Sequence, residues 1–258
     1  MNNKNFKYIY GPVASWRLGS SLGIDPISRK GKICTFDCIY CQLGKTVILT
    51  NEREIFVPVT EIIKELDLLP SVKIDCITFS GMGEPTLAKN LGPIIKSVKK
   101  IRDEKIAVLP NSSLLDKYEV KEDLTLADFA IVKIDVPSQK IFEKVNRPLK
   151  TIKFDTILQA IKDFKHNFKG KLALQIMFIE ENKEYASEIA QIAKEIKPDE
   201  VQVNTPLRPC LVKPLPEQEL NDIINLFSGL NVISVYQTVK KAVKPISLKD
   251  TLARRGKI

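Results

Sequence analysis

The alternation of short apolar segments with longer amphipathic ones constrains the fold of this chain more than any other feature. The short segments are apolar or β-branched throughout, as in strands buried on both faces of a parallel sheet; they cover 75–79, 106–109, 129–136, 172–179 and 201–204, with an earlier one that includes 22–24. The longer segments repeat apolar residues at helical spacing; they begin near residues 59, 91, 157, 189 and 220. Repeated strand–helix units form a parallel sheet with right-handed crossovers. We therefore expect an α/β protein with a partial parallel (β/α)6 barrel, a doubly wound open sheet being the alternative.

The strand–helix rhythm also predicts how the chain is divided. Its 258 residues suit one large domain. We see no linker, low-complexity segment or short-period repeat, and the rhythm ends near residue 232. We expect a core domain over 1–231, including the N-terminal segment, and a short C-terminal extension over 232–258.

Composition excludes several classes of protein. With 44% hydrophobic and 28% charged residues, the chain is neither disordered nor collagen-like. It lacks an uninterrupted run of about 18 apolar residues, so we expect no membrane association. Residues 1–7 lack the apolar region of a signal peptide, and we expect a cytoplasmic protein. The net charge of +9 raises the chance of an anionic partner, such as RNA or a phosphorylated substrate, although the lysines are spread along the chain.

Polar and turn-forming residues gather where the expected strands end, at 80–85, 111–113, 135–138, 180–182 and 204–206. In parallel α/β sheets the site lies at the carboxyl ends of the strands. Polar residues also alternate within the strands, and Gln175 shares a face with Met177 as Gln202 does with Asn204. Because buried polar groups need partners or water, we expect one polar chamber inside the sheet.

Three cysteines, Cys34, Cys38 and Cys41, follow the spacing C-x3-C-x2-C. Three thiolates on a short loop suit an iron–sulfur cluster or zinc. Zinc usually takes a fourth Cys or His at regular spacing, and the single histidine, His166, is more than a hundred residues away. A [4Fe–4S] cluster held by three cysteines keeps one iron open for a substrate or cofactor.

This loop, with Tyr40 just before its last cysteine, resembles the signature of the radical S-adenosylmethionine (SAM) superfamily. The resemblance implies that Cys34, Cys38 and Cys41 hold a [4Fe–4S] cluster whose open iron chelates the amino and carboxylate groups of SAM. An external electron donor of the flavodoxin or ferredoxin type would then drive cleavage of SAM to methionine and a 5′-deoxyadenosyl radical. The fold implied is the partial barrel of the radical SAM type.

The segment Ser80-Gly81-Met82-Gly83-Glu84-Pro85 follows one of the expected strands. It does not fit a dinucleotide-binding turn, because position 86 is Thr instead of the third glycine and Glu84 would repel a pyrophosphate. In radical SAM proteins a similar segment binds the SAM ammonium, which implies this role for Gly81, Met82, Gly83 and Glu84.

The same resemblance places further residues around SAM. Asn111, Ser112 and Ser113 would lie near its ribose or carboxylate, and Met177 near its adenine. The remaining expected cofactor-binding residues face the polar chamber or belong to the cysteine loop: Tyr40, Asp135, Gln175 and Asn204.

Three further motifs, at 11–25, 146–148 (Asn-Arg-Pro) and 204–209, resemble a narrower group. It comprises poorly characterised radical SAM proteins labelled Fe–S oxidoreductases and placed beside the wybutosine (tRNA wyosine) synthases. Arg17, Arg147 and Arg208 in these motifs are candidate contacts for an anion, since arginine grips carboxylates and phosphates with paired hydrogen bonds. Wyosine synthases carry additional N-terminal cysteines for a second cluster, and this chain has no cysteine before Cys34.

Three functions remain open from the sequence. The first is a radical SAM enzyme that abstracts hydrogen from an anionic substrate, a nucleotide or tRNA among the candidates. The second is a radical SAM activase or modifier of a protein partner. The third is a non-enzymatic, metal-containing RNA-binding module, although aromatic residues total only 7% and fall mostly at core positions.

Overall fold

The computed structural model describes residues 6–238 and 241–255. Residues 1–5, on which part of the localisation argument rests, lie outside the described residues. So do residues 239–240 and 256–258 of the expected C-terminal extension.

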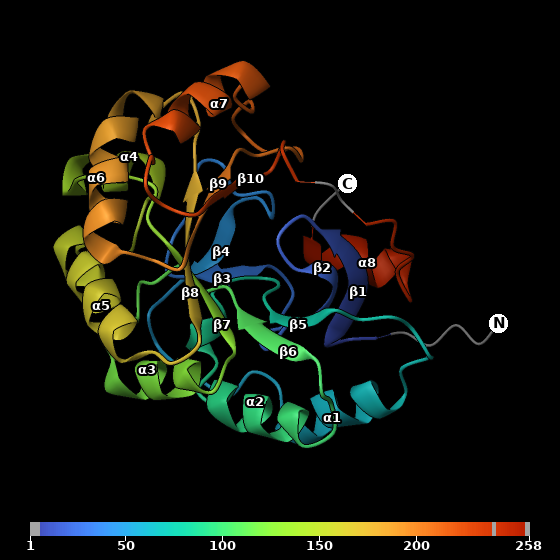
Figure 1. Ribbon diagram of the computed structural model, residues 1–258. Helices are drawn as coiled ribbons and strands as arrows, with labels where there is room; N and C mark the ends of the chain where they lie inside the picture. The colour runs from blue at the N-terminus through green and yellow to red at the C-terminus, as the bar shows by residue number, and fades with distance from the viewer. Residues whose placement is uncertain (1–5, 239–240, 256–258) are drawn as a thin grey trace.

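One curled eight-stranded sheet organises the molecule, in the order β1-β2-β5-β6-β7-β8-β9-β10 (Figure 1). The strands are β1 (Ile9–Ser15), β2 (Gly19–Ile24), β5 (Cys76–Phe79), β6 (Lys105–Val108), β7 (Phe129–Lys133), β8 (Lys171–Met177), β9 (Glu200–Asn204) and β10 (Val232–Ser234). All neighbours from β2 to β10 are parallel, and β1 is antiparallel to β2 at one edge. The expected α/β partial barrel is confirmed.

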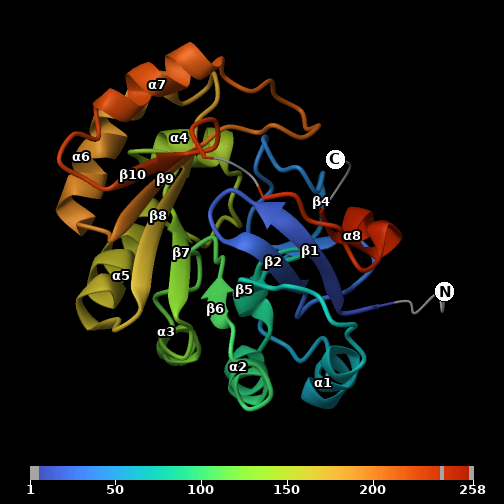
Figure 2. The same ribbon diagram turned by 45° about the vertical axis from the view of Figure 1, so that its right-hand side comes forward.

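All the helices except α8 lie on the convex side of this sheet. The helices are α1 (Val59–Asp67), α2 (Leu91–Lys99), α3 (Tyr118–Thr125), α4 (Gln139–Val145), α5 (Phe154–Asn167), α6 (Ala186–Ile196), α7 (Glu217–Asn225) and α8 (Leu248–Arg255). Figure 2 shows α1, α2, α3, α5, α6 and α7 along one arc outside the strands, while α8 lies beside β1. The apolar stripes of α1, α2, α5, α6 and α7 point inward, as in α5, where Ile157, Ile161 and Phe164 are buried. Among the described helices, none combines the length and the hydropathy needed to cross a bilayer.

The structure adds elements that the sequence pattern did not predict. β1 contains Gly11 and Pro12, which look like a turn, and a register shift between Tyr10 and Val13 accommodates them. β7 ends at Lys133 instead of residue 136. Residues 232–234, the start of the expected extension, form β10 and pair in parallel with β9.

The two ends of the described chain meet along β1. The Phe6 amide donates to Asp250 Oδ2 (3.2 Å), and the Gly11 amide donates to Thr251 Oγ1 (3.0 Å). The Ile246 amide donates to the Gly11 carbonyl (2.7 Å). Helix α8 is therefore fixed against the N-terminal strand, on the side where the barrel lacks further strands.

Candidate active site

The cysteine loop begins at the end of a second, two-stranded sheet. β3 (Lys32–Cys34) pairs in parallel with β4 (Thr46–Leu49), and Cys34 is the last residue of β3. The loop between them carries Cys38 and Cys41. Its backbone bonds attach it to segments that follow β5 and β7, which places all three cysteines at the carboxyl ends of the main strands.

The glycine-rich segment after β5 is bonded directly to β3. The Ile33 amide donates to the Met82 carbonyl (3.0 Å), and the Glu84 amide donates to the Ile33 carbonyl (3.1 Å). A Cβ on Gly83 would lie 1.6 Å from the Ile33 carbonyl oxygen. Position 83 must therefore be glycine for the two segments to approach so closely.

The Asn-Arg-Pro motif holds the cysteine loop from the other side. The Asp37 amide donates to the Asn146 carbonyl (3.1 Å), and the Ile39 amide donates to the Val145 carbonyl (3.0 Å). The Leu149 amide donates to the Thr35 carbonyl (2.9 Å). Two motifs that the sequence resemblance singled out are thus neighbours of the cysteines in space.

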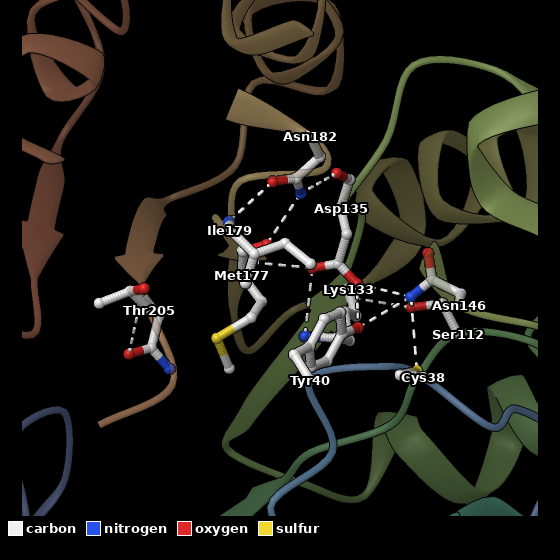
Figure 3. Close-up of polar contacts among 11 residues, drawn as sticks. Cys38, Tyr40, Ser112, Lys133, Asp135, Asn146, Met177, Ile179, Asn182 and Thr205 are labelled. Carbon is white, nitrogen blue, oxygen red and sulfur yellow. Dashed lines mark hydrogen bonds and ion pairs between the residues drawn. The ribbon is translucent and has the colours of Figure 1, made fainter. Parts of the chain in front are cut away.

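Buried hydrogen bonds join the cysteine loop to the end of β7 (Figure 3). The Tyr40 hydroxyl donates to Asp135 Oδ2, and Asn146 Nδ2 donates to the same oxygen (2.8 Å). The Met177 amide donates to Asp135 Oδ1 (2.8 Å), and the Lys133 ammonium is 3.2 Å from that oxygen. Asp135 is 2% exposed, so these partners offset the cost of burying its charge.

The surroundings of the sulfurs fit a thiolate-bound cluster. All three loop cysteines are free thiols. Asn111 Nδ2 is 3.6 Å from Cys34 Sγ, and Asn146 Nδ2 is 3.5 Å from Cys38 Sγ, so two amide donors face two of the sulfurs.

Burial raises the pKa of Cys34 to about 12 and that of Cys38 to about 11, so these thiols must lose protons when a metal binds. Burial opposes the charge of Lys32, but the thiolates together outweigh it and raise the pKa of this ammonium. Lys32 is therefore placed to compensate thiolate charge. Among the described residues, no three His, Cys, Asp or Glu side chains gather around one point as single-ion ligands.

Glu84 is 2% exposed and faces protein donors. Its Oε1 accepts from the Thr86 amide (3.0 Å) and hydroxyl (2.6 Å), and its Oε2 accepts from the Asn111 amide (2.7 Å). Burial raises the pKa of Glu84 to about 7, although these hydrogen bonds lower it. The Ser113 hydroxyl is 2.7 Å from Thr35 Oγ1, and the Ser112 hydroxyl accepts from the Lys133 amide. Glu84, Asn111 and Ser113 are therefore hydrogen-bonded to one another or to Thr35 of the cysteine loop.

A cavity of about 450 Å³ lies inside the half-barrel, within the range of about 300–1,000 Å³ that is common for ligand sites. Gln175, Met177 and Asn204 line it. In the sheet Gln175 is paired with Gln202, and Met177 with Asn204, which puts the expected polar residues of β8 and β9 in two adjacent rows.

Arg17 and Arg208 line the same cavity, whereas Arg147 is exposed and lines neither it nor its neighbour. The structure brings in two arginines that the sequence analysis missed, Arg254 and Arg255 of α8, which line an adjoining cavity of about 220 Å³ together with Arg17 and Arg208. One feature of the sequence could have indicated them. The chain has only eight arginines, and Arg254 and Arg255 are adjacent.

A larger cavity, of about 950 Å³, opens at the amino-terminal ends of the strands, near Asp75, Phe129 and Lys171. Arg17 also lines this cavity, but the expected cluster and cofactor residues, all of them described, do not. The candidate site is therefore the smaller pair of cavities next to the cysteine loop.

Residues 29–193, more than half of the chain, match the family model of the Radical SAM superfamily. The chain belongs to the radical SAM superfamily. As a radical SAM enzyme, it uses a [4Fe–4S] cluster and SAM to generate a 5′-deoxyadenosyl radical and needs an electron donor.

This radical SAM chain is 42% identical to a UPF0026 protein of Synechocystis sp., over 84% of the chain and 80% of that protein. It is 37% identical to a UPF0026 protein of Methanocaldococcus jannaschii, over 87% of this chain and 71% of that protein. A protein of Brachyspira hyodysenteriae named GTPase Obg is also 37% identical, over 95% of the chain and 38% of that longer protein.

Solved structures share its fold. Streptococcus suis SuiB matches with a TM-score of 0.64 and 16% identity, over 84% of this chain and 49% of that chain. The structure of TYW1 with a lysine–pyruvate adduct bound matches with a TM-score of 0.62 and 15% identity, over 81% of this chain and 74% of that chain. At these identities the likeness concerns the fold alone.

Proposed function

We propose that Cys34, Cys38 and Cys41 bind the [4Fe–4S] cluster and that the half-barrel holds SAM next to an anionic substrate, from which the 5′-deoxyadenosyl radical abstracts hydrogen. The observation that carries this proposal is the backbone pairing of the cysteine loop with the Gly81–Glu84 segment. It brings the only three-cysteine loop in the sequence against the segment that resembles the SAM-binding motif of the superfamily.

The residues of this chain have separate roles in the proposal. Backbone groups of 81–83 and the remaining lone pair of Glu84 Oε2, which accepts one hydrogen bond within the protein, would receive the SAM ammonium. Gln175, Met177 and Asn204 would contact the nucleoside part from β8 and β9, where they line the 450 Å³ cavity. Tyr40 and Asp135 would act indirectly, by fixing the loop through their buried hydrogen bonds. Asn111 and Ser113 would hold the cysteine loop through their hydrogen bonds to Thr35. Together with Ser112 they would lie near the ribose of SAM.

The arginines favour an anionic small molecule or nucleotide over a protein partner, because they line internal cavities. A Saccharolobus islandicus relative named probable GTP 3′,8-cyclase, 22% identical over 213 residues, gives a nucleotide as one example of such a substrate. The motifs that resemble the group beside the wyosine synthases keep tRNA as the second candidate. Membership of an enzyme family weighs against the non-enzymatic RNA-binding module.

Anaerobic reconstitution tests this function. Wild-type protein should bind about four irons per chain and form 5′-deoxyadenosine when SAM and a reduced flavodoxin or ferredoxin are supplied. Cys34→Ala should lose both iron and 5′-deoxyadenosine formation, whereas Cys210→Ala, outside the loop, should keep them. Full iron content in Cys34→Ala, or no SAM cleavage by the loaded wild type, would refute the proposal.

A further inference from the structure

Four of the chain's eight arginines meet inside the half-barrel. Arg17 comes from the β1–β2 turn, Arg208 from the segment after β9, and Arg254 and Arg255 from α8. All four line the 220 Å³ cavity, and Arg17, Arg208 and Arg255 also line the 450 Å³ cavity. They therefore surround the region where the two cavities adjoin.

Two of the four guanidinium groups, those of Arg17 and Arg254, are incompletely satisfied among the described residues. Nε and Nη1 of Arg17 and Nε of Arg254 are buried, and among the described residues these atoms have no hydrogen-bond partner. Arg208 donates to Gln42 and to the Arg255 carbonyl, contacts that carry little opposing charge. Buried polar groups without protein partners are uncommon, so these donors are available to a bound anion or water.

The surrounding negative charge is smaller than the positive charge. Asp25 Oδ2 lies 4.0 Å from Arg254 Nε, but burial raises the pKa of Asp25, and its oxygens accept from backbone amides. Glu200 pairs with Lys171 at 2.7 Å. Tyr10 and Cys41 are the other acidic groups that act on these arginines, and Cys41 belongs to the cysteine loop.

Burial first, and mutual repulsion second, lower the pKa values of two of these arginines. Burial, together with the charges of Arg255 and Arg208, lowers the pKa of Arg17 to about 10. Burial and Arg255 lower the pKa of Arg208 to about 10. Because burial and repulsion both destabilise these positive charges, the cluster should bind an oxyanion with more than one negative charge most tightly. A phosphate meets this demand better than a single carboxylate, and the planar guanidinium fork suits its oxygens.

We propose that Arg17, Arg208 and Arg255 bind a phosphate group of the substrate, with α8 as a wall of the substrate site. This inference rests on the proposed function, since it assigns the anionic part of the substrate for that reaction. The SAM carboxylate is the competing occupant, which the experiment must separate.

Titration calorimetry on the cluster-loaded full chain, with SAM at saturation, gives that separation. Inorganic phosphate and pyrophosphate are the probes, and acetate is the carboxylate comparison. The wild type should bind pyrophosphate, phosphate more weakly, and acetate least. Arg17→Gln should weaken pyrophosphate binding roughly ten- to hundredfold, the loss expected for one charge-assisted hydrogen bond. Arg29→Gln, which removes one exposed charge outside the cavities, should bind like the wild type.

Three results would overturn the inference: no binding of either phosphate probe in the presence of SAM, acetate binding as tight as phosphate, or unchanged pyrophosphate affinity in the arginine variants. If Arg17→Gln does not fold, Arg255→Gln at the end of α8 provides the same comparison. Iron content and 5′-deoxyadenosine formation by the wild type are measured in parallel. If the wild type binds iron and forms 5′-deoxyadenosine but does not bind the phosphate probes, only this inference is refuted. If the wild type fails to bind iron or to form 5′-deoxyadenosine, the proposed function is refuted.

Discussion

Tyr40, on the cysteine loop, donates a hydrogen bond to the buried carboxylate of Asp135, 95 residues further along the chain. Tyr40→Phe would remove this donor and leave Asp135 with fewer partners at the same burial. We expect the free energy of unfolding to fall by about 1–3 kcal/mol and the reconstituted iron content to drop, because the loop loses its anchor. Denaturant unfolding and iron analysis measure the two effects. Tyr118→Phe, at a residue 74% exposed, should change neither, and equal behaviour of the two variants would contradict the anchoring role.

Gly83→Ala should disrupt the pairing of the glycine-rich segment with β3, since the added Cβ would meet the backbone of Ile33 and backbone cannot move aside cheaply. We expect a loss of about 1–3 kcal/mol or more in stability, with reduced SAM binding. Gly229→Ala is the matched control, because a Cβ there meets nothing within 4 Å and only the positive φ of 86° costs energy. Fluorescence-monitored unfolding and equilibrium dialysis with labelled SAM decide the matter, and a smaller effect at position 83 than at 229 would be inconsistent with the close contact.

The raised pKa of Glu84 predicts a pH dependence of stability. An unfolded glutamate titrates near 4.5, whereas burial moves the pKa of Glu84 to about 7 in the folded protein. The folded state therefore binds more protons than the unfolded state between these values, so stability is full below pH 4.5 and falls as pH rises through 7. The total change from this residue is about 3 kcal/mol.

Unfolding free energies of the cluster-free protein at several pH values from about 5 to about 8 test this sign. Glu84→Gln should flatten the slope, leaving the part due to Asp25 and Asp123, whose pKa values burial also raises. Exposed Glu52 supplies the control variant Glu52→Gln. A slope that survives unchanged in Glu84→Gln would assign the pH dependence to other groups.

Thr251→Val should loosen α8, because the buried Gly11 amide then loses its acceptor. The expected cost is about 1–3 kcal/mol, accompanied by weaker pyrophosphate binding as Arg255 moves with the helix. Differential scanning calorimetry and the binding titration report the two effects. Thr125→Val, at an exposed position, should alter neither. If Thr251→Val lost stability but kept full pyrophosphate affinity, the helix would not form a wall of the site.

The sequence predicted the parts of the fold that have strong local patterns. The buried strands β5, β6, β8 and β9 and the helices α1, α2, α5, α6 and α7 all have regular apolar spacing, and the structure contains each of them. Helix α3 was missed because only Val120 and Leu124 are buried in it. β1 was missed because Gly11 and Pro12 interrupt its pattern, and only pairing with β2 makes that segment a strand.

The candidate site divides in the same way. The cysteines and the glycine-rich segment form compact motifs, so their spacing and the resemblance to the radical SAM superfamily made them candidates from the sequence. Arg17 and Arg208 were recognised as possible anion contacts, but their convergence with Arg254 and Arg255 depends on contacts between residues more than 200 positions apart. Nothing in the local sequence distinguishes Arg255, which lines the cavity, from Arg147, which does not. Such long-range assembly is set by tertiary packing.

The docking of α8 on β1 makes the anion pocket dependent on the last described segment of the chain. A fragment that stops before Ser247 would retain every loop cysteine and the glycine-rich segment, yet would lack two of the four arginines. A protein trimmed by a protease at this end would thus keep the residues proposed for SAM cleavage but lose part of the proposed phosphate site. It would cleave SAM without binding a phosphorylated substrate.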